Sequence, residues 1–348
     1  MFSKNLKYYR LKNGFTKKEL AEMVDVKPSM ITYYENGRSK PGMDNMKKLA
    51  AALNVRISDF LVARDQDVKY SHGEFRRKST LPKMQQDLVR EQVEEYFNRF
   101  MTVVEILGGE VLPAGPNCHT LPLAEDDEAN GMALRRLLGI AEEGPIKDLI
   151  GTLENKGILI YECDIGDNRF SGINGTVNGR PYIALNPHMT PERNRSTIAH
   201  ELAHLMFDWG ASDKTAEKDI EKRATAISGA FLFCKEDALR ELGLKRSAIS
   251  NDMVPTAVEY GISMMMLAKR AELLGIVSAE AYQRFCMWAS HAGWRTDEPP
   301  RINPEKPTLF RQLTSRAVCE KEISIQRGAE LLQIPYTEME SLCYFREV

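Results

Sequence analysis

The chain has 348 residues, of which 43% are hydrophobic and 28% charged, and its formal net charge is -2 at pH 7. This length and composition indicate a soluble globular protein of two or three domains. No run of about 18 apolar residues could span a membrane, and charged residues interrupt any early apolar segment, so we expect neither a membrane protein nor a secreted one. The six cysteines are scattered and form no CxxC pair, which favours a reducing, cytoplasmic location.

Residues 1–65 are predicted to form a bundle of short helices with an excess of basic side chains. Gly14 ends the first helix, and Thr16 caps the second, with Glu19 three residues later completing a capping box. A short turn leads to Pro28, which suits the first position of a third helix. The order is helix, tight turn, helix, and the basic charge favours a polyanionic partner.

This segment resembles the Cro/CI-type, or XRE-type, helix-turn-helix family over residues 5–61. The resemblance rests on these positions: Leu6, Arg10, Thr16, Glu19, Leu20, Ala21, Val26, Ile31, Tyr34, Glu35, Asn36, Gly37, Pro41, Leu49, Ala50, Leu53, Val55, Phe60 and Leu61. In that family the third helix enters the major groove of DNA. The resemblance therefore implies base contacts from Ser29, Thr32 and Tyr33, and phosphate contacts from Lys17, Lys27, Arg38 and Lys40.

Residues 62–81 lose apolar periodicity and are predicted to be a linker, in which a basic cluster at 75–78 forms a solvated face. A long amphipathic helix is predicted from Pro82 to Leu107, because Gly108 and Gly109 follow it. Its apolar stripe consists of Leu88, Val93, Phe97, Phe100, Val104 and Leu107.

A second domain is predicted to begin near residue 110, with an irregular stretch up to about residue 131. Two short helices are then expected at 133–138 and 146–156, followed by strands at 158–161, 170–173 and 181–185. Asn178-Gly179 is a hairpin-type turn before the last strand. A small sheet therefore precedes the most informative stretch of the chain.

Residues 200–204 are His-Glu-Leu-Ala-His, the HExxH pattern, in a segment with apolar residues at helical spacing. On a helix His200 and His204 lie one turn apart on the same face, so both imidazoles can bind one metal ion with Glu201 beside it. A third protein ligand would leave the fourth position of a tetrahedral zinc site for water. The alternative is a buried helix with two ordinary histidines, but the chain has only six histidines and the pattern is rare by chance.

Glu217 and Glu221, both on the next predicted helix, are candidates for the third ligand. Glu221 lies three residues before Ala224 and seven before Ser228, on a face with small residues, and Glu217 lies one turn earlier on nearly the same face. Spacing alone leaves both candidates open. His188 lies in a loop ahead of the HExxH segment and is not expected to be a ligand.

From about residue 135 to 274 the chain resembles the ImmA/IrrE family of metallopeptidases. The resemblance is carried by Gly157, Ile158, residues 183–186, Arg195, Thr197, residues 199–204, residues 221–224, Phe231, Leu232, Ser263, Leu267 and Arg270. It implies that His200, His204 and Glu221 bind the metal, since the first glutamate of the downstream helix is a ligand in that family. It also implies zinc, with manganese as an alternative, and a role for Glu201 in taking a proton from water and returning it to the leaving amine.

These features predict a mostly helical α+β protein of four regions. The regions are a helix-turn-helix DNA-binding domain at 1–65, a linker and long amphipathic helix at 66–109, a zincin-like metallopeptidase domain with a small sheet at 110–290, and a helical C-terminal region at 291–348. Within the last region, Ser324 is expected to cap a helix that runs to about Leu332.

The expected function is control of gene expression. We expect the protein to bind a double-stranded DNA operator as a homodimer, because operators of such domains are palindromic. The peptidase is expected to cut a helix-turn-helix repressor, an antitoxin-like partner or the chain itself. The alternative is a DNA-binding repressor or antitoxin whose peptidase-like domain is catalytically silent and serves sensing or dimerisation.

Overall fold

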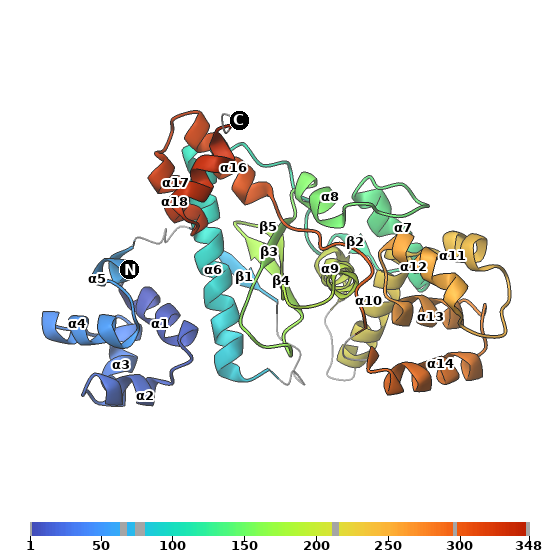
Figure 1. Cartoon of the computed structure of the whole chain (residues 1–348), viewed down its shortest axis with the longest axis horizontal. Coiled ribbons are helices and arrows are strands. Elements are labelled where there is room, and N and C mark those ends of the chain that lie inside the picture. The colour runs from blue at the N-terminus through green and yellow to red at the C-terminus, as the bar shows by residue number, and fades with distance from the viewer. Residues whose placement is uncertain (1, 63–67, 74–80, 211–215, 295–297, 346–348) are drawn as a thin grey trace.

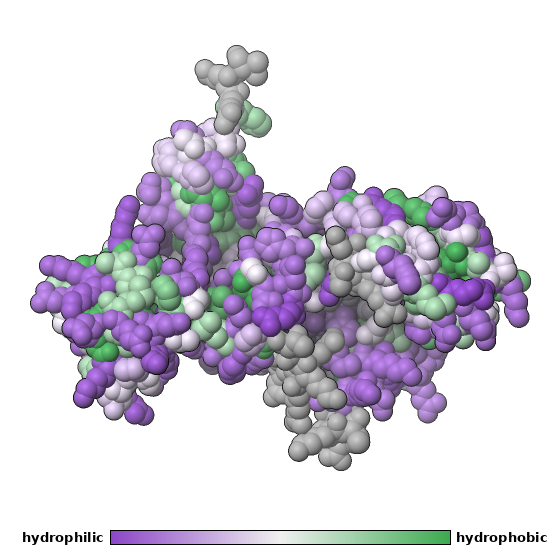
Figure 2. Space-filling model, turned by 60° about the horizontal axis from the view of Figure 1, so that its bottom comes forward, coloured by the Kyte–Doolittle hydropathy of each residue, from purple (hydrophilic) through white to green (hydrophobic). Residues whose placement is uncertain are grey.

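The computed structural model describes residues 2–62, 68–73, 81–210, 216–294 and 298–345 (Figure 1). The chain is mostly helical with a small mixed sheet, as the sequence predicts. A helical lobe at the N-terminus lies beside the body, and Figure 2 shows a largely hydrophilic surface over both. No helix in the described ranges is both long enough and apolar enough to cross a membrane. The basic cluster expected at 75–78 lies outside the described residues.

The N-terminal lobe is a bundle of short helices, as predicted, and it contains five of them. They are α1 (Phe2–Lys12), α2 (Lys17–Met23), α3 (Pro28–Glu35), α4 (Met43–Ala52) and α5 (Ile57–Leu61). Leu6, Leu20, Ile31 and Phe60 have no exposed surface and form its centre. Asp25, with a φ of 57°, makes the left-handed turn that sets α2 against α3. This is the geometry expected of a helix-turn-helix.

The capping box predicted at the start of α2 is confirmed. The side-chain hydroxyl of Thr16 accepts a hydrogen bond from the backbone N–H of Glu19 at 3.2 Å, and the Glu19 carboxylate accepts one from the backbone N–H of Thr16 at 2.7 Å. We expect Thr16→Ala to lower the free energy of unfolding by about 1 kcal/mol, because the substitution removes the hydroxyl acceptor. Urea denaturation followed by circular dichroism measures this loss, and Thr16→Ser, which keeps the hydroxyl, should stay close to wild type.

The main sheet has four strands in the order β1-β4-β5-β3. They are β1 (Tyr70–His72), β3 (Leu159–Glu162), β4 (Gly172–Val177) and β5 (Arg180–Leu185). β3 runs parallel to β5, whereas β1 and β4 pair antiparallel. The turn between β4 and β5 is Asn178-Gly179, and both residues have positive φ, as its hairpin signal predicts. β1 corrects the prediction that residues 62–81 form only an irregular linker.

The long helix α6 (Lys83–Ile106) covers one face of this sheet (Figure 1). Val93 and Phe97 of α6 are fully buried and share a core with Ile173 and Tyr182 from the sheet. The predicted apolar stripe is therefore confirmed as the buried face of α6.

The opposite face of the sheet packs against α9 (Pro191–Met206), the helix that contains the HExxH pattern (Figure 1). Ile198 and Leu202 of α9 are fully buried in a second core, together with Ile183 and Leu185 of β5. Thr190 caps α9 by accepting a hydrogen bond from the backbone N–H of Arg193. The sheet thus provides a fixed support for the HExxH residues.

The remaining helices of the body are α7 (Asp127–Leu137), α8 (Leu149–Asn155), α10 (Ala216–Leu232), α11 (Lys235–Leu242), the 3-10 helix η1 (Asn251–Met253), α12 (Val254–Tyr260), α13 (Met264–Leu273) and α14 (Ala279–His291). Of these, α10 packs directly against α9. A two-stranded sheet pairs β2 (Leu121–Pro122) with β6 (Phe207–Asp208). α7 begins six residues before its predicted start at 133. Gly131 lets α7 approach α10 closely, since a Cβ there would lie 2.6 Å from the Cβ of Ala230.

The C-terminal region repeats the helix-turn-helix geometry. It consists of α16 (Leu309–Cys319), α17 (Ile325–Leu332) and α18 (Tyr336–Cys343), and the last of these was not predicted. Ser324 caps α17 as expected, and Gln333, with a φ of 56°, makes the turn that Asp25 makes in the N-terminal lobe. The backbone N–H of Ile334 donates to the carbonyl of Ala329 at 3.1 Å, as Val26 does to Ala21 at 3.0 Å.

Candidate metal centre and DNA-binding face

α9 places the two histidines of the HExxH pattern one helical turn apart. The Nε2 atoms of His200 and His204 lie 3.1 Å from each other, and the ring centroids are 4.7 Å apart. His200 is only 8% exposed, and both rings lie between α9 and α10. The ring of Trp209 packs against the ring of His204, with the two centroids 5.6 Å apart, and this contact restricts the orientation of the imidazole.

α10 brings one carboxylate to the two imidazoles. The Oε2 atom of Glu221 lies 3.3 Å from Nε2 of His200, and its Oε1 atom lies 3.5 Å from Nε2 of His204. These three residues form a cluster of potential metal ligands among the described residues, and Glu217 is not part of it. The structure thus brings Glu221, rather than the other candidate, to the histidines. His188 lies elsewhere, where it pairs with Asp164 at 2.9 Å.

The distances among the two imidazoles and the carboxylate are compatible with a tetrahedral ion. Two ligand atoms about 2.0–2.1 Å from a tetrahedral zinc ion lie about 3.3–3.4 Å apart. The two Nε2 atoms lie 3.1 Å apart, and the distances to the carboxylate are 3.3 Å from Nε2 of His200 to Oε2 and 3.5 Å from Nε2 of His204 to Oε1, each close to that value. Two imidazoles and one carboxylate are also the donor set that catalytic zinc sites use. The residues present therefore fit a metal ion.

Thr225, one turn after Glu221 on α10, favours the histidine tautomer that a metal needs. Its hydroxyl donates to the backbone carbonyl of Glu221 at 2.8 Å, so its oxygen is left to accept from Nδ1 of His200, 3.4 Å away. A proton on Nδ1 leaves the lone pair on Nε2, which is the atom in the cluster.

Glu201 contacts a residue that the sequence did not single out. The side-chain amide of Asn174 on β4 donates to Oε2 of Glu201 at 2.6 Å. This bond holds the carboxylate on the β4 side of α9. Asn174 lies 27 residues before Glu201, so no local spacing connects them, and it follows directly after the strand predicted at 170–173.

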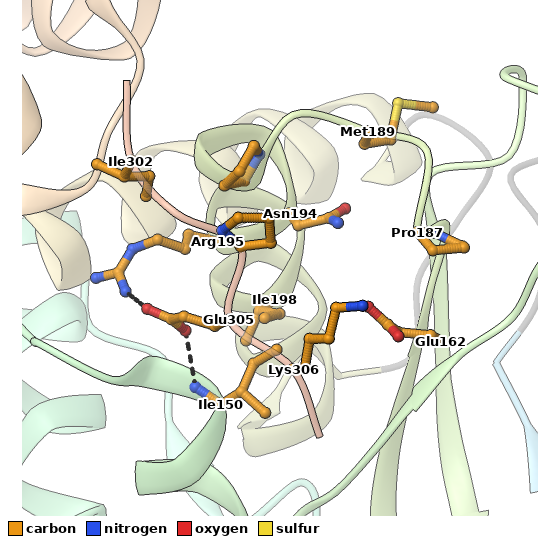
Figure 3. Close-up of a pocket in the computed structure, with 12 residues that line it drawn as sticks. Ile150, Glu162, Pro187, Met189, Asn194, Arg195, Ile198, Ile302, Glu305 and Lys306 are labelled. Atoms are coloured by element: carbon orange, nitrogen blue, oxygen red, sulfur yellow. Dashed lines mark hydrogen bonds and ion pairs between the residues drawn. The ribbon is translucent and has the colours of Figure 1, made fainter. Parts of the chain in front are cut away.

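The cavity in Figure 3 is distinct from this centre and has a structural role. It has a volume of about 180 Å³ and lies near the start of α9, where Arg195 forms an ion pair with Glu305. Glu305 also accepts hydrogen bonds from the backbone N–H groups of Leu149 and Ile150, both at 3.0 Å. Through the ion pair with Arg195 and the two hydrogen bonds from α8, Glu305 attaches the C-terminal segment to α8 and α9.

The predicted DNA-contacting residues lie on and around α3. Ser29 and Tyr33 are exposed, and the Tyr33 side chain is 42% exposed. Thr32 is partly buried, and its hydroxyl donates to the carbonyl of Pro28 at 3.4 Å. Three of the four predicted phosphate contacts are exposed: Lys27, Arg38 and Lys40.

Lys17 has a different environment from the other basic residues. Its Nζ atom lies 3.5 Å from Oε2 of Glu35, whose carboxylate forms a buried ion pair with Arg10. The same carboxylate therefore joins α1, α2 and α3. Lys17 is still 40% exposed through its side chain and lies next to the start of α2.

Comparison with known proteins gives two family matches. The family described as Helix-turn-helix matches residues 6–60, and the peptidase family described as IrrE N-terminal-like domain matches residues 153–272. An uncharacterized HTH-type transcriptional regulator of Archaeoglobus fulgidus is 32% identical over 63 residues, which are 18% of this chain and 90% of that protein. No solved structure matches the chain.

Proposed function

The chain belongs to the helix-turn-helix transcriptional regulators and carries an IrrE-like peptidase domain, and from this premise we propose that it is a gene regulator whose metal centre cleaves a regulatory protein. The observation that carries the proposal is the cluster of His200 and His204 on α9 with Glu221 on α10, together with Glu201 beside His200 on α9. The helix-turn-helix binds DNA. The cleavage reaction and the role of each residue below are the proposal.

DNA recognition is assigned to the exposed side of α3. Ser29, Thr32 and Tyr33 contact base edges in the major groove. The four basic residues around α3 contact phosphates: Lys17, Lys27, Arg38 and Lys40. One such unit reads one half-site, so the protein binds a palindromic operator as a homodimer.

Arg38 offers a test of the phosphate contacts. We expect Arg38→Ala to weaken binding to all DNA sequences by a similar factor and to reduce the slope of log K against log salt by about 1, because one fewer counterion is released. Fluorescence anisotropy with labelled duplex at several salt concentrations measures both. Lys245→Ala removes an exposed charge from the body of the protein and should leave the slope unchanged. An unchanged slope in Arg38→Ala would contradict the assignment.

A metal ion would be held by Nε2 of His200, Nε2 of His204 and the carboxylate of Glu221. Zinc suits this donor set and spacing, and manganese is the alternative. When bound, the ion acts as a Lewis acid that polarises a peptide carbonyl and lowers the pKa of water. Thr225 and Trp209 orient the two imidazoles toward it.

Glu201 is the proton carrier of the reaction. Its carboxylate takes a proton from the attacking water and later delivers that proton to the leaving amine of the cleaved peptide. Asn174 keeps the carboxylate in place through its hydrogen bond, so Glu201 starts the reaction already oriented. Asn174 is therefore assigned as a positioning residue.

The substrate is a helix-turn-helix repressor, an antitoxin-like partner or another copy of the same chain. The test is to incubate the purified full-length protein with one equivalent of zinc, or after removal of metal by chelation, together with β-casein as an unstructured substrate. Mass spectrometry identifies fragments of casein and of the protein itself. We expect fragments only in the zinc-loaded sample. A protein that binds zinc but produces no zinc-dependent fragment would contradict a peptidase function and favour a silent domain.

A further inference from the structure

β4 is at one edge of the three strands that lie within the peptidase match, and it lies beside α9. Asn174 of β4 contacts Glu201 with its side chain, and its backbone carbonyl faces the side of β4 away from β5. An exposed edge of this kind offers a row of backbone N–H and C=O groups to which an extended peptide can add as another strand.

In this protein the edge of β4 is covered by the chain's own β1. The pairing is antiparallel, with Tyr70 opposite Val177 and His72 opposite Gly175. The backbone N–H of Gly73 donates to the carbonyl of Asn174 at 2.7 Å. The β1 segment therefore ends opposite Asn174, whose side chain binds Glu201. β1 lies outside the residues that match the peptidase family and directly follows the helix-turn-helix lobe in the sequence.

We propose that residues 70–73 occupy the surface on which the peptidase binds its substrate as an extended strand, so that β1 competes with the substrate and slows cleavage without abolishing it. This inference rests on the proposed function. β1 has only three residues, and none of their side chains is fully buried. Backbone hydrogen bonds alone hold so short a strand weakly, so another strand can displace it.

The pairing depends on small residues at the contact. A Cβ at Gly175 would lie 2.2 Å from the backbone oxygen of Ser71, and a Cβ at Gly73 would lie 2.8 Å from Oδ1 of Asn174. Ser71 itself is exposed, so its side chain contributes little packing. Because the contact at Gly175 is with a backbone oxygen and the residue opposite Gly175 is His72, the requirement for a small residue falls on β4 and not on the strand that pairs with it.

One carboxylate on α6 ties β1 to the DNA-binding lobe. Oε1 of Glu94 lies 3.3 Å from Nε2 of His72 on β1, and Oε2 lies 3.4 Å from Nζ of Lys4 on α1. A second ion pair, between Lys7 and Glu91 at 2.8 Å, joins the same two helices. Burial disfavours the charged form of Glu94, but the hydrogen bond to His72 and the charge of Lys4 lower its pKa on balance. Glu94 is therefore ionised at neutral pH and holds both partners.

Movement of the DNA-binding lobe away from α6 would remove Lys4 from Glu94 and weaken the hold on His72. The position of the lobe thus regulates access to the edge of β4. This arrangement connects the DNA-bound state of the regulator to the state of its peptidase within one chain.

Peptide binding tests the inference without depending on catalysis. The probe is a fluorescein-labelled peptide of residues 68–73, and the protein is full-length and carries Glu201→Gln so that the probe is not cut. Ser71→Pro removes a backbone donor from β1 and prevents its pairing, whereas Ser71→Ala keeps the backbone intact. Fluorescence anisotropy should show the probe binding at least about tenfold more tightly to the proline variant, because the tethered strand competes at an effective concentration in the millimolar range. Equal affinity in the two variants would overturn the inference.

Two further measurements separate the parts of the proposal. The affinity of Lys4→Ala for the probe should lie between the affinities of Ser71→Ala and Ser71→Pro. Lys18→Ala is the control in the same lobe. If Lys4→Ala and Lys18→Ala bound the probe equally well, the role of Glu94 in the coupling would be overturned.

In proteins with an intact Glu201, Ser71→Pro should cleave casein about tenfold faster than Ser71→Ala at a fixed zinc concentration. If the probe binds more tightly but no variant cleaves casein, the proposed function fails while the role of β1 stands.

Discussion

Replacing Glu201 with glutamine is expected to lower the rate of peptide cleavage by about 10²–10⁴-fold and to leave zinc binding intact. Glutamine has the same shape and can still accept the hydrogen bond from Asn174, but its amide cannot take a proton from water. Initial rates of casein cleavage, together with zinc content by mass spectrometry, measure the two effects on the same preparation.

Glu217→Gln provides the matched control, since it makes the same chemical change on α10 outside the ligand cluster. Its cleavage rate should stay within a few-fold of wild type. If Glu201→Gln cleaved at the wild-type rate with a full zinc content, the proposed role of Glu201 in proton transfer would be wrong.

Zinc is expected to stabilise the wild-type protein by more than it stabilises His204→Ala. A ligand present at 100 times its dissociation constant stabilises the folded state by about 2.7 kcal/mol, so the melting temperature of the metal-free protein should rise on addition of zinc. His204→Ala removes one of the three ligands and should bind zinc at least about tenfold more weakly. Calorimetric scans with zinc and with a chelator give both melting temperatures.

His188→Ala is the control for this experiment, because His188 lies in a loop, pairs with Asp164 and is outside the cluster. It should show the same zinc-induced rise in melting temperature as wild type. A rise of equal size in His204→Ala would mean that zinc binds elsewhere, and the assignment of the metal centre would have to be withdrawn.

Features encoded by neighbouring residues were predictable from the sequence. The capping box depends on Thr16 and Glu19, three residues apart, and the long helix α6 depends on one apolar stripe and its flanking proline and glycines. The spacing of His200 and His204 likewise follows from helix geometry alone. In each case the interacting groups lie within one or two turns, so the local pattern carries the information.

Features that depend on tertiary packing were not predictable in the same way. Glu217 and Glu221 share nearly one helix face, and only the approach of α10 to α9 brings Glu221 to the histidines. Asn174 becomes important because β4 lies beside α9, which no spacing within β4 indicates.

Short elements in polar stretches were missed for a related reason. β1 has three residues, too few to show an alternating pattern, and its stability comes from contacts with Glu94 and Tyr182 rather than from its own sequence. α18 has only eight residues, begins directly after Pro335 and carries two glutamates, so its packing through Met339 was not evident.

α6 connects most parts of the protein within a short stretch of helix. Residues 91–94 hold the DNA-binding lobe and β1, Phe97 fills the sheet core, and Arg99 donates to the carbonyl of Leu331 in the C-terminal region. One inserted or deleted residue would turn everything beyond it by about 100° and shift it by about 1.5 Å. The evolutionary consequence is a fixed length: homologous chains should tolerate insertions and deletions before α6 but not between residues 91 and 99, and aligned sequences of such chains would reveal this as a gap-free block.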